Sequence, residues 1–296
     1  MALEPTQSPH LLPELIQEIV EICAEGSLSQ AAALATISRD FNKCVRPILS
    51  RTLMCNYSSP SLQWPVPVKN LPRWLETNGK YVRNVIWGIN VNDGVLQSIF
   101  ERCPGITNLA IWVNTSSNDI SNLLPAISTL RLYRLSISLS DLFSQHNFSE
   151  PEASSGAFRS ITHLDIIFDG TKWEEFEGIT HLPCLTHLSL PQQTFTPTYT
   201  KMINSILREC PRLKVLVLVA GRGFSSDAPV QASQVPCDYE THDGGNDEDP
   251  RLVAFDCDYV ADWVYGATGR KDIWALADEI VARRLEDRKN LDYLQS

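Results

Sequence analysis

A six-residue pattern of apolar and polar positions recurs along the middle of the chain. Apolar residues occupy the first, fourth and sixth positions of VRNVIW, ITNLAI, LYRLSI, ITHLDI, LTHLSL and LKVLVL, which begin at Val82, Ile106, Leu132, Ile161, Leu185 and Leu213; a looser copy, LVAFDC, begins at Leu252. In a strand, alternate side chains point to opposite faces. Each copy therefore predicts one strand, with these three positions on a buried face and the third and fifth positions on the other.

The segments between these strands have the spacing of helices. One helical face gathers Val95, Leu96, Ile99 and Phe100 in NDGVLQSIFERCP, and another gathers Met202, Ile203, Ile206 and Leu207 in TPTYTKMINSILRECP. Weaker helices are predicted for NDISNLLPAIST and KWEEFEGI. Most copies begin roughly 24 to 29 residues apart, inside the period of leucine-rich repeats. The pattern predicts an α/β fold, a curved leucine-rich-repeat solenoid with parallel strands.

Residues 11–55 are predicted to be wholly helical. The first helix, LLPELIQEIVEIC, has an apolar side that covers roughly 160°, whereas the stripe of an ordinary surface helix is about 100° wide or somewhat more. Gly26 ends this helix, and Ser38 caps a later one that Pro47 kinks or restarts. The excess apolar width is buried either by the rest of the chain or by another protein.

The same patterns set the expected domain boundaries. A final helix near 271–290 gathers Trp274, Ala277, Ile280 and Val281 on one face and is predicted to cap the open end of the solenoid. The predicted parts are a helical module (1–55), a Pro-rich connector (56–80), the solenoid (81–260) with an acidic loop insertion at 225–250, and a C-terminal cap (261–296).

Charge and composition exclude several classes of function. The 296 residues have a net charge of −10, and the 25 basic residues form no patch, so neither nucleic acid nor an anionic membrane is an expected partner. MALEPTQSPH is no secretory signal, and no apolar run approaches the ~20 residues that span a bilayer, so we expect an intracellular protein of the cytoplasm or nucleus. The eight cysteines lack C-x-x-C spacing, which favours reduced thiols over a zinc site.

The outward positions of the strands predict a row of polar and aromatic side chains on the concave face. We expect this row to bind a target protein through Asn84, Asn108, Trp112, Arg134, His163, Asp165 and His187; a merely solvated strand face is the alternative. Two histidines on neighbouring strands beside an aspartate also make a metal or acid–base site geometrically possible. The simpler interpretation is that this repeat carries Thr-His at exposed positions.

Motifs of catalysis are absent from the sequence. There is no G-x-S-x-G and no G-x-x-x-x-G-K-[ST]. Cys103 and Cys210 each precede a proline at a helix-to-strand junction, which the repeat explains without reactivity. The acidic residues at 238–249 lack the order of a calcium loop. We therefore expect no enzymatic activity, no metal and no cofactor.

The helical N-terminus resembles the F-box. The resemblance is carried by LPELI at 12–16, Ile19, and LATISRDF at 34–41, where Phe41 stands in place of the family's usual tryptophan. The wider chain resembles fungal F-box proteins with leucine-rich repeats, in VRPILSRTL and in DPRLVAFDCDYVADWVYGATGRKDIWALADEIVARR. The resemblance implies a three-helix unit that docks onto a Skp-type adaptor, and through it onto a cullin, by Leu12, Pro13, Leu15, Ile16, Ile19, Val20, Leu34, Ile37 and Phe41.

These observations together predict a substrate-recognition subunit of a Skp–cullin–F-box ubiquitin ligase. Its contribution to catalysis is proximity alone, because it holds an unknown target near a ubiquitin-charged enzyme. The alternative is a leucine-rich-repeat scaffold outside any ligase, in which the N-terminal helices only cap the solenoid.

Overall fold

The computed structural model describes residues 12–55, 66, 68–88, 93–112, 120–143, 148–154, 156–167, 178–192, 197–221, 240–241, 249–257 and 259–295. Three predicted features fall wholly or mostly outside these residues: the acidic insertion at 225–250, the first half of the connector, and the helix expected in KWEEFEGI.

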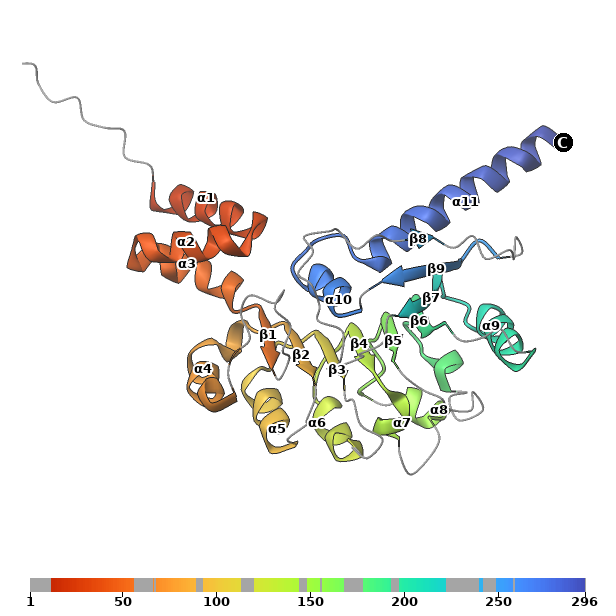
Figure 1. The fold of residues 1–296 in the computed structure, drawn as a ribbon. Helices are drawn as coiled ribbons and strands as arrows, with labels where there is room; N and C mark the ends of the chain where they lie inside the picture. The colour runs from red at the N-terminus through yellow and green to blue at the C-terminus, as the bar shows by residue number, and fades with distance from the viewer. Residues whose placement is uncertain are drawn as a thin grey trace, which may run out of the picture.

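One open sheet runs through the described part of the chain (Figure 1). Its order is β1-β2-β3-β4-β5-β6-β7-β9-β8; neighbours pair in parallel up to β9, and β8 is antiparallel to β9. The α/β class and the parallel strands are thus confirmed. The strands are β1 (Thr52–Cys55), β2 (Asn84–Gly88), β3 (Asn108–Trp112), β4 (Arg134–Ile137), β5 (His163–Ile166), β6 (His187–Pro191), β7 (Val215–Gly221), β8 (Glu240–Thr241) and β9 (Leu252–Cys257).

Strand pairing follows the six-residue pattern without a slip. Five residues of the predicted polar row pair with one another in sequence order across β2 to β6 and form one column: Asn84, Asn108, Arg134, His163 and His187. The same backbone hydrogen bonds recur where the strands begin: the first residue of a strand and the residue before it both donate to one carbonyl oxygen just before the preceding strand. Both Thr107 and Asn108, for example, donate to the carbonyl oxygen of Arg83. A side-chain period of two makes such register strict wherever one face is buried.

Helices on one side of the sheet enclose the main apolar core (Figure 1). The faces predicted for α5 and α9 are buried there or packed against it: Leu96, Ile99 and Phe100 on α5, with Val95 partly buried, and Met202, Ile203, Ile206 and Leu207 on α9. These outer helices are α4 (Leu71–Asn78), α5 (Asp93–Arg102), α6 (Leu124–Ile127), α7 (Leu139–Leu142), α8 (Glu150–Ala153) and α9 (Pro197–Glu209), with 3-10 turns at Val68–Asn70, Gly79–Tyr81 and Ser121–Leu123.

Three helices precede the sheet and form what we call the helical module: α1 (Pro13–Gly26), α2 (Leu28–Ile37) and α3 (Arg39–Leu49). Ser38 caps α3 as predicted, since its Oγ accepts from the Phe41 N–H at 3.1 Å. Pro47 lies near the end of α3, which continues to Leu49.

The prediction that residues 11–55 are wholly helical is wrong at its end. Residues 52–55 form β1, whose Leu53 and Cys55 side chains belong to the main core, so the first strand of the sheet follows the module directly. Likewise α4, in the stretch expected to be connector, packs as the first outer helix through Leu71 and Leu75.

The chain ends with α10 (Tyr259–Ala267) and α11 (Ile273–Gln295), which we call the C-terminal segment, residues 259–295. The segment lies on the face of the sheet opposite the outer helices (Figure 1), here called the inner face. Gly269, with φ of +78°, makes the turn between the two helices in a conformation that favours glycine.

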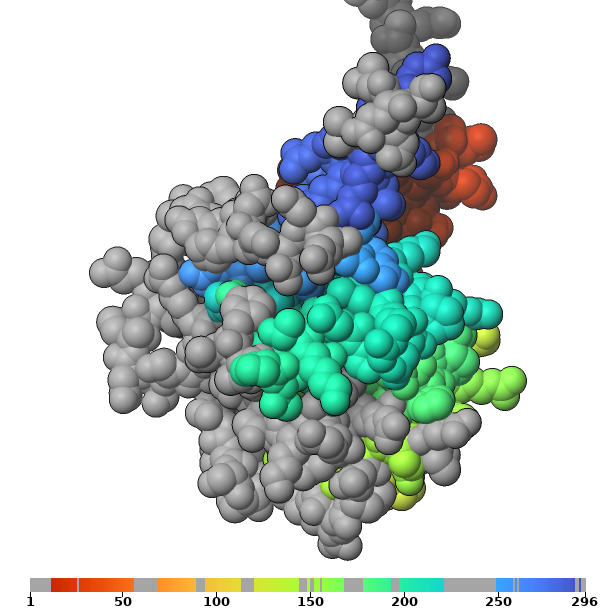
Figure 2. Space-filling view, turned by 90° about the vertical axis from the view of Figure 1, so that its right-hand side faces the viewer, coloured from red at the N-terminus to blue at the C-terminus, as the bar shows by residue number. Residues whose placement is uncertain are grey.

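The sequence predicts that the final helix caps the open end of the solenoid. In the structure the segment does more than this, because it also covers the first strands. Trp263 of α10 packs with Met54, Ile86 and Ala110 on the first strands, whereas α11 packs on β7 and β9. Figure 2 shows α11, in dark blue, standing above the light blue and blue-green atoms of the last strands and α9.

Candidate functional site

Two surfaces carry the residues predicted to bind partners, and the first is an apolar face on the helical module. Leu12, Leu15, Ile19 and Ile22 follow one another at spacings of three and four, so they lie on one side of α1. They are 63%, 44%, 50% and 65% exposed, and Ile37 at the end of α2 is 64% exposed. The four side chains on this side of α1 are here called the apolar face.

The module does not need this face for its own packing. The other apolar side of α1 points into a small core of Val20, Ala24, Ala31, Val45 and Ile48. This core is a cluster of its own, separate from the core beneath the outer helices. The wide apolar sector of the first helix is therefore shared between an internal side and an exposed side.

The nine predicted adaptor-binding residues divide in the same way. Leu12, Pro13, Leu15, Ile19 and Ile37 are exposed. Ile16, Leu34 and Phe41 are half-buried and pack against the module core, so they chiefly hold the helices together.

Val20 is 4% exposed and lies within that core, so it offers no surface to a partner; its prediction as a contact is wrong. Ile22 belongs to the apolar face although it was left out of the predicted contacts. Ile22 lies in the apolar sector of LLPELIQEIVEIC, and only the packing of α2 and α3 shows which edge of that sector stays exposed.

The second surface is the inner face, where the predicted target-binding row lies. The expectation that this row faces solvent is wrong. Asn84, Trp112, Asp165 and His187 are buried, and Asn108, Arg134 and His163 are partly buried. The reason is the C-terminal segment, which returns across the sheet and packs on the outward positions of the strands.

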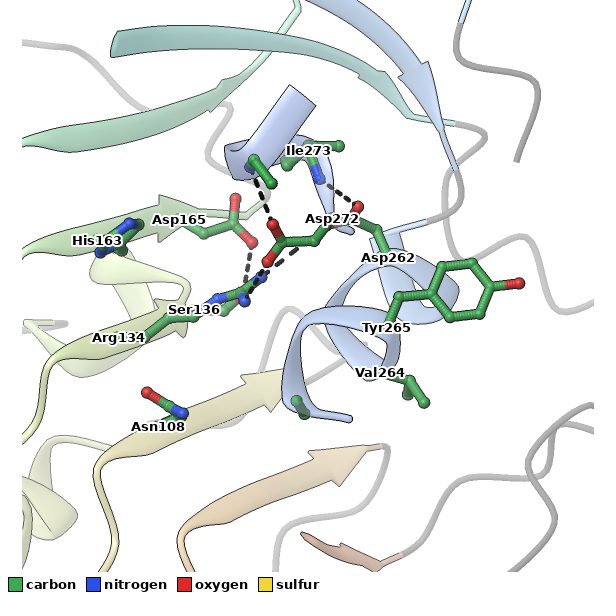
Figure 3. A network of polar contacts seen from close by, with 12 residues as sticks. Asn108, Arg134, Ser136, His163, Asp165, Asp262, Val264, Tyr265, Asp272 and Ile273 are labelled. Atoms are coloured by element: carbon green, nitrogen blue, oxygen red, sulfur yellow. Dashed lines mark hydrogen bonds and ion pairs between the residues drawn. The ribbon is translucent and has the colours of Figure 1, made fainter. Parts of the chain in front are cut away.

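Arg134 forms the centre of this contact (Figure 3). Its Nη1 lies 2.7 Å from Asp272 Oδ2 and its Nη2 lies 3.9 Å from Asp262 Oδ2, and all three side chains are almost buried. The two carboxylates also order the start of α11: Asp262 accepts from the Ile273 N–H at 2.7 Å, and Asp272 accepts from the Ala275 N–H at 3.1 Å. One cation thus ties α10 and α11 to β4.

His163 and His187 stack on one another under α11. Their ring centroids are 4.1 Å apart with 5° between the planes, and the indole of Trp274 meets both rings edge-on at 5.5 and 5.7 Å. His187 Nε2 lies 3.2 Å from Asp278 Oδ1, and its Nδ1 lies 2.8 Å from the Thr186 hydroxyl. Because a carboxylate only accepts, a neutral His187 ring that bonds to Asp278 carries its proton on Nε2. Its Nδ1 is then an acceptor facing the Thr186 hydroxyl, which also donates to the Thr162 carbonyl oxygen at 3.1 Å.

Burial keeps both imidazoles neutral. It lowers the pKa of His163 to about 3, and the neighbouring His187 and the charges of Arg134 and Lys214 act in the same direction. Burial also lowers the pKa of His187, although Asp278 opposes the shift. The two rings therefore pack as aromatic, hydrogen-bonding groups at neutral pH.

Asp165 turns to a different partner from the histidines. It accepts from Ser136 Oγ at 2.7 Å, and Ser136 Oγ accepts from Trp112 Nε1 at 2.8 Å. Burial raises the pKa of Asp165, and the hydrogen bond from Ser136 offsets part of that shift. Within the described part of the chain, no group of three or more His, Cys, Asp or Glu is placed to hold a metal ion.

The cysteines that the structure describes are free thiols. Burial raises the pKa of Cys55 and of Cys103 to about 12, so neither presents a reactive thiolate at neutral pH. Among the described helices, none has both the length and the apolar character required to cross a bilayer.

No protein-family model and no curated protein matches this chain. The apolar face and the covered inner face are therefore the observations on which a functional proposal rests.

Proposed function

We propose that this protein is a substrate receptor of a Skp–cullin–F-box ubiquitin ligase. In this role the helical module binds a Skp-type adaptor through the apolar face, and the repeats carry the site for a target protein. The protein performs no chemistry itself and acts by holding the target near the ubiquitin-charged enzyme.

The observation that carries this proposal is the exposure of Leu12, Leu15, Ile19, Ile22 and Ile37 on one small module. Single exposed apolar residues are ordinary, but a contiguous apolar patch on a folded protein marks an interaction site. The module already has its own core, so nothing within the described chain requires this patch for packing. Its position on the first of three helices fits the F-box resemblance in the sequence.

The adaptor-facing role and the packing role fall on different residues. Leu15 and Ile19 lie at the middle of the apolar face, where a partner would exclude water from them most fully. Val20, one residue further, secures the helix to the module. A substitution on the face is therefore expected to remove binding without unfolding the helices.

Direct binding of the full-length protein to a purified Skp-type adaptor tests the proposal. We expect a Kd of about 1 µM or tighter, and a loss of about 100-fold or more in the variant Leu15→Glu/Ile19→Glu, because two charges would be buried at the centre of the interface. Calorimetry or interferometry gives the affinity, and circular dichroism verifies the fold.

Leu285→Glu is the matched control. It introduces the same charge at a leucine that is 42% exposed on α11, on a different element from the apolar face. Adaptor binding is expected to be unchanged. Undiminished binding by a folded Leu15→Glu/Ile19→Glu variant would refute the adaptor-docking role.

A scaffold outside any ligase is the second candidate, and the direct continuation of the module into β1 favours it. Ser50 donates to Asn78 Oδ1 at 3.2 Å, and Arg51 pairs with Glu25 at 3.4 Å, so the module also contacts the start of the repeats. In that case no adaptor binds the wild-type protein, and the helical module only caps the repeats.

A further inference from the structure

The C-terminal segment meets the inner face through specific polar pairs. Asn84 donates to the Ala267 carbonyl oxygen at 2.9 Å, near one end of the row. Arg134 holds Asp272 at its middle, and His187 contacts Asp278 nearer to the last strands. These contacts place the segment at three points along the column of outward-facing residues.

Two tryptophans of the segment fill the apolar positions between those contacts. Trp263 meets Trp112 edge-on at 6.3 Å and lies under the Arg134 guanidinium, 5.4 Å from it. Trp274 covers the histidine stack. Gly266 lies so close to Arg134 and Asp272 that a Cβ at this position would collide with both side chains. The segment thus meets the row through three polar contacts, at Asn84, Arg134 and His187, and through the two indoles.

The repeats keep their own core without this segment. Among the described residues, the main apolar cluster lies between the strands and the outer helices and ends at Leu218, with Leu252 and Ala254 packed against it. The segment contributes instead to two smaller clusters on the inner face. Detachment of α10 and α11 would therefore uncover the inner face while the core on the other side of the sheet remained packed.

Charge at the contact also favours recognition over permanent packing. Apolar side chains of similar volume often stabilise a protein as well as a buried ion pair does, whereas an ion pair selects a partner with the matching charge. When the segment is absent, Arg134 loses the carboxylates of Asp262 and Asp272 and presents its cation beside Trp112 and the histidines. That uncovered surface is the row that the sequence predicts to bind a target.

We propose that the inner face is a docking site for an acidic helix that carries tryptophan, that the C-terminal segment occupies it as an internal ligand, and that a target helix of the same chemistry displaces the segment. The proposal rests on the receptor function above, because it names the class of target. Recognition would use a carboxylate on Arg134, a second carboxylate on His187, and an indole against the histidine stack.

Hydrogen exchange of the wild-type full-length protein is the first test. If the segment detaches, amides of α10 and of residues 273–281 exchange about tenfold faster than those of β4 to β6, because local opening needs less free energy than global unfolding. Equal protection in both regions would show that the segment opens only with the whole fold, and would overturn the proposal.

A labelled peptide of residues 259–283 is the probe for docking in trans. Asp262→Asn/Asp272→Asn loosens the segment but leaves Arg134 in place, and asparagine still caps α11. We expect the peptide to bind this variant about tenfold more tightly than it binds the wild type. If the double variant does not fold, Asp272→Asn alone serves.

Arg134→Gln is the matched control, because it breaks the same ion pairs but also removes the cation from the docking site. It is expected to show no gain in peptide affinity. Equal gains in both variants would mean that the peptide binds any loosened protein, and no gain in either would mean that the site accepts no helix in trans; both results overturn the proposal.

Two further measurements separate neighbouring explanations. Dimerisation of the loosened variant in light scattering, without peptide binding, would assign the site to a second copy of the chain and overturn the proposed partner. Adaptor binding through Leu15 and Ile19 is measured on the same samples. If the peptide binds tightly and the adaptor does not bind, the ligase role is refuted and the docking site remains. If the adaptor binds and the peptide does not, the docking site is refuted and the ligase role remains.

Discussion

The helical module and the inner face of the sheet reverse the usual distribution of side chains. On the module, Leu15, Ile19 and Ile22 are apolar and exposed, whereas on the inner face Asn84, Asp165 and His187 are polar and buried. Either arrangement costs free energy unless a partner or a hydrogen bond compensates. The inner face has its compensation within the chain, because the C-terminal segment bonds to Asn84 and His187 and Ser136 bonds to Asp165. The apolar face has none among the described residues.

This difference shows that periodicity identifies the outward positions of an element but not what lies over them. The same register that aligns Asn108, Arg134 and His163 predicts an open binding row. A segment more than a hundred residues further along decides that the row is covered. A surface that the sequence marks for binding can therefore be occupied already.

The largest change in stability is expected from a substitution in the C-terminal segment, where it covers the inner face. Trp274→Ala should lower the free energy of unfolding by about 3–5 kcal/mol, because it leaves a cavity above the histidine stack. Tyr293→Ala, at a side chain that is 82% exposed near the end of the same helix, should change it by less than about 0.5 kcal/mol. Urea unfolding measures both. Similar changes in the free energy of unfolding for the two variants would show that α11 does not pack on the inner face in solution.

A smaller effect is expected from acid, again only on the inner face. An unfolded histidine takes up its proton near pH 6.5, but folded His163 does so only near pH 3. The unfolded chain therefore binds more protons between these values. Stability is full above pH 6.5 and falls below it, by up to about 1.4 kcal/mol per pH unit for each such histidine.

The groups that face these rings are Arg134, Lys214, Asp272 and Asp278, and only the two aspartates favour protonation of His187. Unfolding free energies measured between pH 7 and pH 4 test this dependence. His163→Gln should flatten the slope, since it removes a histidine whose pKa burial lowers to about 3. An unchanged slope in that variant would assign the acid sensitivity to other groups.

Much of the fold could be predicted from the sequence because it is set by local repetition. The six-residue pattern gave the strands and their register, and helical spacing gave the buried face of α9, including Met202 and Ile206. The strand at Thr52–Cys55 was missed, because four residues directly after a helix carry too little periodicity to be told from its continuation.

The interaction surfaces were predicted less completely, because exposure depends on contacts between distant parts of the chain. Nothing in the local pattern of the inner face indicates that Asp272 reaches Arg134, or that Asp278 reaches His187. On the module, the apolar sector of the first helix is wider than its own packing needs, which indicates that part of it stays exposed. The exposed residues of that sector could be identified only from the packing of α2 and α3 against Val20 and Ala24.

The smallest effect is expected on the apolar face, and it is the one that separates the two proposed roles of the module. Leu15→Ala and Ile19→Ala should each change the stability of the module by less than about 0.5 kcal/mol, because both side chains are already half-exposed. Val20→Ala, in the module core, should cost about 1–3 kcal/mol. Hydrogen exchange of α1 to α3 is the appropriate measurement, since the module has a core of its own.

A loss of stability for Leu15→Ala as large as that for Val20→Ala would mean that the chain itself covers the face in solution. The wide apolar sector would then belong to internal packing, and the scaffold would be the better account of the protein.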